Sequence, residues 1–205
     1  ILISVYNLFG DTYGQTFNEG EYGDPSQILN QLKQVRQKAD GSGWEIIGVG
    51  QEGVTLRASE NGVDDIYGSA QSDVLVGNDQ NNVIIGSTGN DNGGDNDMIE
   101  GKGGDDVLLG KEGHDHIDGG DGDDQIDGGI GNDRLIGGAG NDVIIGGEGD
   151  DVIEGNDGDD QIDAGAGDDI IYAGVGNDTI ASGIGHDQID AGDGNDVIFS
   201  ESGDD

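Results

Sequence analysis

Hydrophobic residues recur once every nine positions over the C-terminal half of the chain. From Gly101 to Phe199 the sequence divides without gaps into eleven nine-residue units, such as GGAGNDVII at 137–145. The eighth residue of every unit is Leu or Ile, and its two neighbours vary. This pattern predicts a three-residue strand whose middle side chain points inward. Two units would complete one coil of eighteen residues, and stacked coils would share a thin, continuous core.

The first six positions of each unit are small or polar and predict a turn between strands. The fourth residue is always Gly and the sixth is always Asp. The first two positions are small in most units, and the departures at the second position are Lys102, Lys111 and Asn156. Glycine turns tightly because it accepts positive φ values at little steric cost.

Two earlier units, at residues 68–85, keep the register but depart from the pattern. Gln71 and Gln80 replace the fourth-position glycine, and Asn82 replaces the aspartate. The following segment, 86–100, equals one unit with about six extra residues, which we expect to form a longer loop. Any binding site built on the glycine and aspartate columns should be weaker or missing in these units.

Charge narrows the possible partners. The 205 residues include 45 acidic and 7 basic side chains, for a formal net charge of −38, and no cysteine. Such a chain is repelled by nucleic acids and by anionic membranes, and it has no apolar stretch long enough to enter a bilayer. Low hydrophobicity with high net charge is typical of disorder. We therefore expect the fold to depend on counter-ions.

The aspartate column predicts calcium sites. Stacked coils lie roughly 4.8 Å apart, so equivalent turns would place their carboxylates in close files. Residues 68–205 carry 35 acidic and 3 basic residues, and nothing in the chain neutralises them. Carboxylate and carbonyl oxygens suit Ca²⁺, which accepts six to eight of them, whereas Mg²⁺ demands stricter octahedral geometry.

The repeat G-G-x-G-x-D-x-U-x resembles the nonapeptide of the repeats-in-toxin (RTX) family of calcium-binding proteins. The resemblance covers residues 68–205, with the regular array at 101–205, and implies an all-β, right-handed parallel β-roll. It also implies that each ion lies between two turns on one edge, so that Asp106 shares an ion with Asp124 and Asp115 with Asp133. Five gaps per edge predict about ten Ca²⁺ ions.

The predicted calcium ligands are the sixth-position aspartates and the backbone of the fourth-position glycines. The aspartates are Asp73, Asp97, Asp106, Asp115, Asp124, Asp133, Asp142, Asp151, Asp160, Asp169, Asp178, Asp187, Asp196 and Asp205. The glycines are Gly104, Gly113, Gly122, Gly131, Gly140, Gly149, Gly158, Gly167, Gly176, Gly185 and Gly194.

The family resemblance further implies a secretion route. Calcium modules outside the cell bind at about 10⁻⁴ to 10⁻³ M, so the chain should be unfolded at cytosolic calcium levels and fold after export. The family implies type I secretion of the Gram-negative kind. The opening residues, from Ile1, lack the basic flank and cleavage site of a signal peptide. We expect a segment of a larger secreted protein.

Residues 1–67 differ in composition and predict a small α+β unit. Residues 1–9 resemble a strand, Pro25–Ala39 has the apolar spacing of a helix, and 44–49 and 54–58 resemble two strands joined by a glycine-rich turn. This unit could cap the roll or end an upstream domain.

Three sharper hypotheses compete with simpler ones. His114 and His116 could form a zinc or copper site, but exposed bystanders fit their positions better. The Asp24–Pro25 bond resembles a self-cleavage site of some RTX proteins, yet helix capping accounts for it. The stretch STGND at 87–91 resembles ice-binding repeats, although the third-position column contains no Thr file.

Catalysis is not expected, because all three His lie in the repeats and no HExxH motif is present. Three functions stay open: a calcium-driven folding and spacer module of a secreted toxin or enzyme, an extender of a surface adhesin, and a glycan- or protein-binding module. Outward apolar pairs, Ile170 with Tyr172 and Val197 with Phe199, could form a contact patch.

Overall fold

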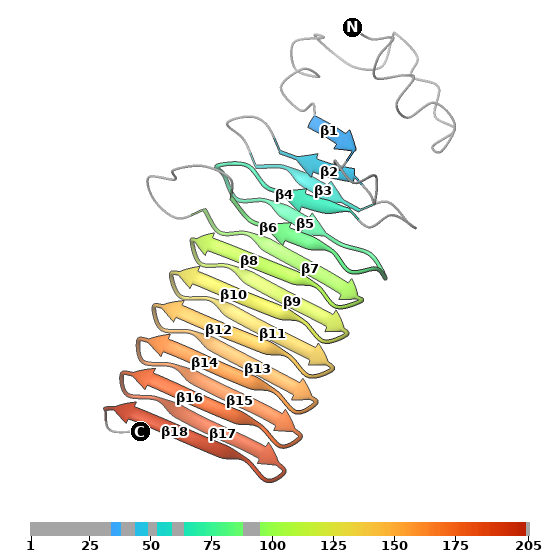
Figure 1. The fold of residues 1–205 in the computed structure, drawn as a ribbon. Coiled ribbons are helices and arrows are strands. Elements are labelled where there is room, and N and C mark those ends of the chain that lie inside the picture. The colour runs from blue at the N-terminus through green and yellow to red at the C-terminus, as the bar shows by residue number, and fades with distance from the viewer. Residues whose placement is uncertain (1–33, 38–43, 49–52, 59–63, 88–94, 204–205) are drawn as a thin grey trace, which may run out of the picture. The chain divides into compact units, whose positions relative to one another are not determined.

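Two facing parallel sheets form the described part of the chain (Figure 1). The computed structural model describes residues 34–37, 44–48, 53–58, 64–87 and 95–203. The strands are β1 (Gln34–Gln37), β2 (Trp44–Ile47), β3 (Thr55–Arg57), β4 (Asp65–Tyr67), β5 (Val74–Val76), β6 (Val83–Ile85), β7 (Met98–Gly103), β8 (Val107–Glu112), β9 (His116–Asp121), β10 (Gln125–Ile130), β11 (Arg134–Ala139), β12 (Val143–Glu148), β13 (Val152–Asp157), β14 (Gln161–Ala166), β15 (Ile170–Val175), β16 (Thr179–Ile184), β17 (Gln188–Asp193) and β18 (Val197–Ser202).

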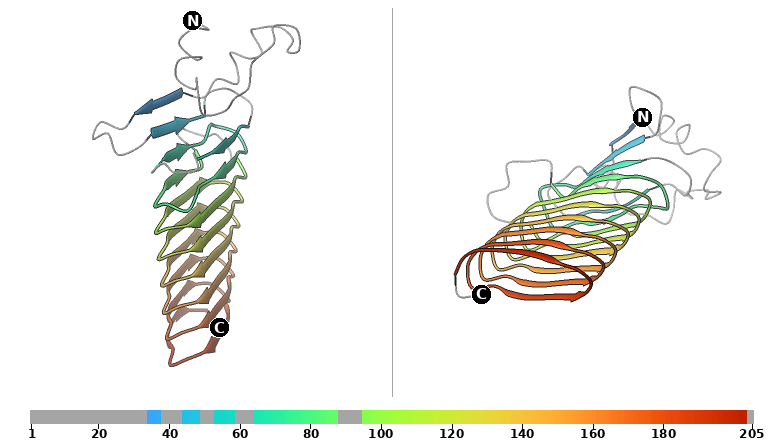
Figure 2. Two further views of the ribbon diagram at one scale, coloured as in Figure 1. Left: turned by 90° about the vertical axis from the view of Figure 1, so that its right-hand side faces the viewer. Right: turned by 60° about the horizontal axis from the view of Figure 1, so that its bottom comes forward.

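Successive strands alternate between the two sheets, so the chain winds as a solenoid of about eight coils (Figure 2). The even-numbered strands and β1 form one sheet, and the odd-numbered strands from β3 to β17 form the other. All strand pairings among the described residues are parallel except that of β1 with β2. Ile126 lies opposite Leu108 on one side and Ile144 on the other, an offset of eighteen residues. The predicted all-β parallel roll and its two-unit coil are confirmed.

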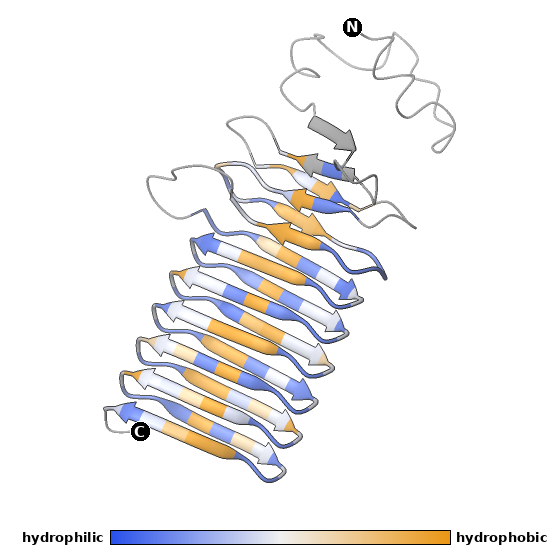
Figure 3. Cartoon of the chain, viewed as in Figure 1, coloured by the Kyte–Doolittle hydropathy of each residue, from blue (hydrophilic) through white to orange (hydrophobic). Residues whose placement is uncertain are grey.

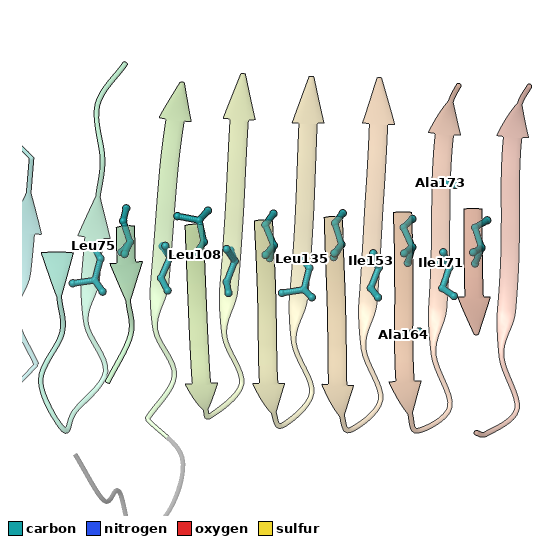
Figure 4. Packing of buried hydrophobic residues seen from close by; sticks show 14 of the residues in the cluster. Leu75, Leu108, Leu135, Ile153, Ala164, Ile171 and Ala173 are labelled. Carbon is teal, nitrogen blue, oxygen red and sulfur yellow. The ribbon is translucent and has the colours of Figure 1, made fainter. Parts of the chain in front are cut away.

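The eighth-position residues form the core. They lie in single file from each sheet and meet in the space between the sheets, as Figure 4 shows for Leu108, Leu135 and Ile153. From Leu56 to Ile180 every such side chain is at most 3% exposed. Burying one Leu or Ile contributes roughly 1.5–3 kcal/mol. Because each coil supplies only two of these residues, the core is continuous but thin.

The strands of the array are longer than the sequence predicts. From β7 to β18 each has six residues, so positions one to three of the next unit continue the strand and only positions four to six turn. Gly129 and Ile130 pair with Gly147 and Glu148 of the next coil. The prediction of a six-residue turn was wrong because small residues can remain extended and bond with the neighbouring coil.

The solenoid extends upstream of the regular repeats. The predicted strands at 44–49 and 54–58 are confirmed as β2 and β3, which lie in opposite sheets. The predicted helix was wrong over Gln34–Gln37, where β1 pairs antiparallel with β2. Pairing with an open sheet edge overrides the weak helix propensity. The rest of that helix, the strand at 1–9 and the Asp24–Pro25 bond lie outside the described residues.

The segment 86–100, with its six extra residues, does not interrupt the parallel pairing of strands. Val74 of β5 lies opposite Met98 of β7, an offset of twenty-four residues in place of eighteen. The six extra residues are therefore accommodated between strands, as predicted. Residues 88–94, which include most of the STGND stretch, lie outside the described part of the chain.

The outer surface is mixed in polarity. Figure 3 shows hydrophobic segments within the strands and hydrophilic turns at both edges. Tyr172 and Phe199 are 48% and 57% exposed, but they lie on β15 and β18, which belong to opposite sheets. The part of the chain that the structure describes has no helix able to span a bilayer.

Candidate metal centre

Each sixth-position aspartate of the array lies at the inner side of a turn, directly before a strand. Alternation along the chain turns the sixth, eighth and first positions inward. The aspartates from Asp97 to Asp187 are at most 4% exposed, whereas Asp196 is half-buried and Asp205 lies outside the described residues. A buried carboxylate is costly unless it is neutralised and hydrogen-bonded.

One carboxylate oxygen of each aspartate is hydrogen-bonded to the preceding coil. The backbone N–H of Asp106 donates to Oδ1 of Asp124 at 2.8 Å, and that of Asp115 donates to Oδ1 of Asp133 at 2.7 Å. These are the two pairs of aspartates that the family resemblance implies. The same bond joins Asp97–Asp115, Asp124–Asp142, Asp133–Asp151, Asp142–Asp160, Asp151–Asp169, Asp160–Asp178, Asp169–Asp187 and Asp178–Asp196.

The second carboxylate oxygen has no hydrogen-bond donor. This holds for the buried Oδ2 atoms of Asp106, Asp115, Asp124, Asp133, Asp142, Asp151, Asp160, Asp169 and Asp178.

Seven of these Oδ2 atoms, at every sixth position from Asp106 to Asp160, lie beside a first-position glycine and a main-chain carbonyl. A β-carbon placed on Gly128, for example, would lie 2.5 Å from Asp133 Oδ2 and 2.8 Å from the carbonyl oxygen of Gly146. A buried carboxylate oxygen that has no donor and lies close to a carbonyl oxygen is suited to a cation.

Burial raises the pKa of these carboxyl groups against the opposing effect of the backbone hydrogen bond. The pKa rises from the ordinary 3.8 to about 7 for Asp106 and Asp133, and to about 6 for Asp124 and Asp142. Neighbouring aspartates of the same file raise it further. Without a cation, neutral pH therefore leaves these groups between the charged and neutral forms.

The fourth-position glycines stack in a second file at each edge. Their φ angles are positive from Gly104 to Gly185, which favours glycine. The carbonyl oxygen of Gly131 would lie 2.1 Å from a β-carbon on Gly149, so these carbonyls are directed along the file toward the next turn. Second-position residues also have positive φ, including the non-glycine Lys102, Lys111 and Asn156.

A ladder at the outer edge was not recognised in the sequence. The fifth position is always Asp, Asn or His, and its side chain accepts the N–H of the fifth residue one coil later. His114 belongs to this ladder, because its Nδ1 accepts the N–H of Asn132 at 2.7 Å. The signal was present in the sequence, since all eleven fifth-position side chains can accept a hydrogen bond.

The histidines do not assemble a separate site. Across the described ranges, no three His, Cys, Asp or Glu side chains gather in a way that could hold a metal ion. The candidate sites accordingly depend on two carboxylates per gap together with backbone carbonyls. A first-position carbonyl such as that of Gly146 was not among the predicted ligands, although the invariably small first position pointed to it.

The sixth-position residues before the array, Asp73 and Asn82, have hydrogen-bond partners that differ from those of the array aspartates. Oδ1 of Asp73 accepts the N–H of Val54 at 2.5 Å and the hydroxyl of Ser69 at 3.0 Å, and its Oδ2 accepts the N–H of Ser69 at 2.5 Å. Asn82 accepts the N–H of Asn78 at 2.9 Å through Oδ1. Both oxygens of Asp73 thus have donors within the protein.

The repeat geometry matches what a comparison with known families finds. The sequence matches the family described as RTX calcium-binding nonapeptide repeat (4 copies) at residues 60–92, 91–126, 100–135, 127–162, 136–171, 145–180, 154–189 and 172–205. The chain belongs to the RTX family. Its roll is a calcium-binding structural module. No curated protein and no solved structure matches the chain.

Proposed function

We propose that this RTX roll is a calcium-operated folding module of a larger secreted protein, disordered at low calcium and folded when it binds about ten ions. The observation that supports it best is the row of buried Oδ2 atoms that have no donor. A cation beside each one would be held by carboxylate and carbonyl oxygens, the ligands that Ca²⁺ prefers. Within the described array, no basic residue stands at the fourth or sixth position to neutralise these carboxylates.

The proposed ligands are the sixth-position aspartates and main-chain carbonyls of the first and fourth positions. Ten gaps, from Asp97–Asp115 to Asp178–Asp196, are each closed by one amide-to-carboxylate hydrogen bond. A gap between Asp187 and Asp205 would add one more, and Asp73 would contribute least. This count agrees with about ten ions.

The energetics favour a switch over a preformed roll. A pKa near 6 or 7 in place of 3.8 corresponds to about 3–4 kcal/mol per aspartate at neutral pH, as an upper estimate. Over the array this exceeds the roughly 5–15 kcal/mol that stabilises a typical domain. Calcium bound beside these carboxylates would neutralise them, and binding to the folded state alone would stabilise the roll by mass action.

The same energetics suit export. Cytosolic calcium lies well below the range of about 10⁻⁴ to 10⁻³ M in which extracellular calcium modules bind, so the chain would remain unfolded inside the cell. Secretion in unfolded form through a type I system would follow, with folding outside. The module would act as a folding and structural segment of a toxin, enzyme or adhesin without catalysis of its own.

A calcium titration tests this function. Far-UV circular dichroism of the full chain at pH 7.5 should show a cooperative coil-to-β transition near millimolar calcium, reversed by chelator and not reproduced by magnesium. Equilibrium dialysis should then count about ten ions. A chain whose array is β-rich in chelator and indifferent to calcium would overturn the proposal.

A further inference from the structure

Two inward polar side chains of the coils before the array, Asp73 and Asn82, have hydrogen-bond partners within the protein. We define the upstream coils as the described residues between 44 and 87, and the array as residues 95–203. In the upstream coils Asp73 takes the inward position and is 2% exposed. It receives two N–H donors and one hydroxyl, from Val54 and Ser69. The Val54 N–H corresponds to the inter-coil donor that each array aspartate also has on Oδ1. The N–H of Ser69 on Oδ2 supplies the donor that the array aspartates lack.

Another inward position of the upstream coils, one coil after Asp64, carries an amide in place of a carboxylate. Asn82 is 1% exposed, and its side chain both accepts and donates. Oδ1 accepts the N–H of Asn78, and Nδ2 donates to the carbonyl of Asp64 at 3.1 Å. An uncharged side chain with its own donor needs no counter-ion, so this turn is complete within the protein.

The upstream coils nevertheless share the core of the array. Leu56, Ile66, Leu75 and Ile84 are fully buried and continue the file of eighth-position residues. Residues 44–87 carry seven acidic side chains and one basic, against twenty-nine and three in residues 101–205. The upstream coils therefore gain a comparable burial per coil with much less charge repulsion.

Hydrogen bonds connect the upstream coils directly to the first aspartates of the array. The N–H groups of Asp73 and Asn82 donate to Oδ1 of Asp97 and Asp106, both at 2.7 Å. The carbonyl of Asp73 accepts the N–H of Met98 at 2.9 Å. If the upstream coils are folded, both donors are already in place when the first carboxylates of the array arrive.

We propose that the upstream coils are a calcium-independent template on which the array folds. They would persist in the calcium-free chain, orient Asp97 and Asp106, and make array folding proceed from β7 toward β18. This inference rests on the proposed function, because it concerns where calcium-driven folding of the array begins.

Hydrogen exchange of the full chain, followed by mass spectrometry in chelator and at stepwise calcium, tests the template. In chelator at pH 7.5, peptides from 64–87 should exchange at least tenfold more slowly than an unstructured chain, while peptides from 101–199 should exchange freely. Rising calcium should protect β7 and β8 before β17 and β18. Free exchange of 64–87 in chelator would overturn the template while leaving calcium-driven folding intact. Protection of 101–199 in chelator would instead overturn the proposed function.

A matched pair of variants sharpens the test. Asn82→Asp removes the amide donor and adds a buried charge, so protection of 64–87 in chelator should fall at least tenfold and return with calcium. Asn81→Asp adds the same charge at an exposed neighbour and should change protection less than twofold. Equal effects of the two variants would show that charge alone, and not the Asn82 amide, accounts for the result, and would overturn the role assigned to Asn82.

Discussion

The upstream coils and the array have the same register and the same buried file of Leu and Ile, yet they neutralise their inward polar groups in different ways. Asp73 has donors from Val54 and Ser69, whereas Asp133 has an N–H on one oxygen and none on the other. The comparison teaches that the hydrophobic repeat defines the coil, while the sixth-position environment decides whether the coil needs an ion.

The largest expected effect comes from protons as substitutes for calcium. Because burial raises the folded-state pKa of Asp106 and Asp124 to about 7 and 6, the metal-free roll binds more protons than the unfolded chain above pH 3.8. Its stability is present at low pH and is lost as pH rises through 6–7. In chelator, acidification from pH 7.5 to 5 should restore β-structure to the array by circular dichroism. Signals that stay coil-like at pH 5 would contradict this expectation.

A single aspartate in the middle of the array should have the next largest effect. Asp151→Ala removes a carboxylate from two gaps and leaves the N–H of Asp133 without its acceptor. We expect the loss of about two ions in dialysis and of roughly 2–4 kcal/mol in calcium, with no change in chelator.

Asp157→Ala is the matched control for that variant. Asp157 is exposed at the end of β13. Its replacement by Ala changes the net charge by the same amount as Asp151→Ala but leaves the sixth-position aspartates intact. If both variants lose the same number of ions, the inward file is not the binding element.

Removing a hydroxyl from the upstream coils should have a smaller effect on stability, and one that does not depend on calcium. Ser69→Ala removes the 3.0 Å hydrogen bond to Asp73 and should cost about 1 kcal/mol. The loss should be the same with and without calcium, as measured by exchange of residues 64–87. A loss that appears only in calcium would place Asp73 among the ion-dependent residues.

The smallest expected effect is a gain in stability from a substitution at Asn156. Asn156 holds a φ of 78° at the second position, where eight of the eleven units have glycine. Asn156→Gly should stabilise the calcium-bound array by about 0.5–1 kcal/mol in urea denaturation, because glycine accepts this φ without steric cost. Its counterpart Gly149→Ala, at φ 129°, should destabilise the array, since the added β-carbon would meet the carbonyl of Gly131.

Much of the roll was predictable because its strongest signals are periodic. The eighth-position core and the eighteen-residue coil follow from residue spacing. The resemblance to the RTX family implies the pairing of Asp106 with Asp124. Strand length was not predictable in this way, because glycine-rich positions fit a turn or an extended strand equally well. Only pairing with the next coil decides between them.

The upstream coils were harder to read for a physical reason. Strands β2 and β3 lack the glycine and aspartate columns, so the sequence shows only short apolar runs there. The unit that ends with β4 has Gly62 and Asp64 at the fourth and sixth positions, a signal that the sequence analysis missed. Their place in the sheets depends on pairing partners some twenty residues away, such as Ile46 with Ile66. The donors to Asp73 come from Val54 and Ser69, and no repeat pattern marks either of them.

The hydrogen bonds of the turns give the roll a mechanical character. Sixth-position amides donate to the following coil and fifth-position amides to the preceding one, so each turn is fastened in both directions. A force that peels the last coil must break both sets together before the next coil bears the load. Each peeled coil would release eighteen residues, about 60 Å of extended chain, for roughly 4.8 Å of axial length. The array would therefore extend in discrete steps, as a tether whose resistance is set by the calcium concentration around it.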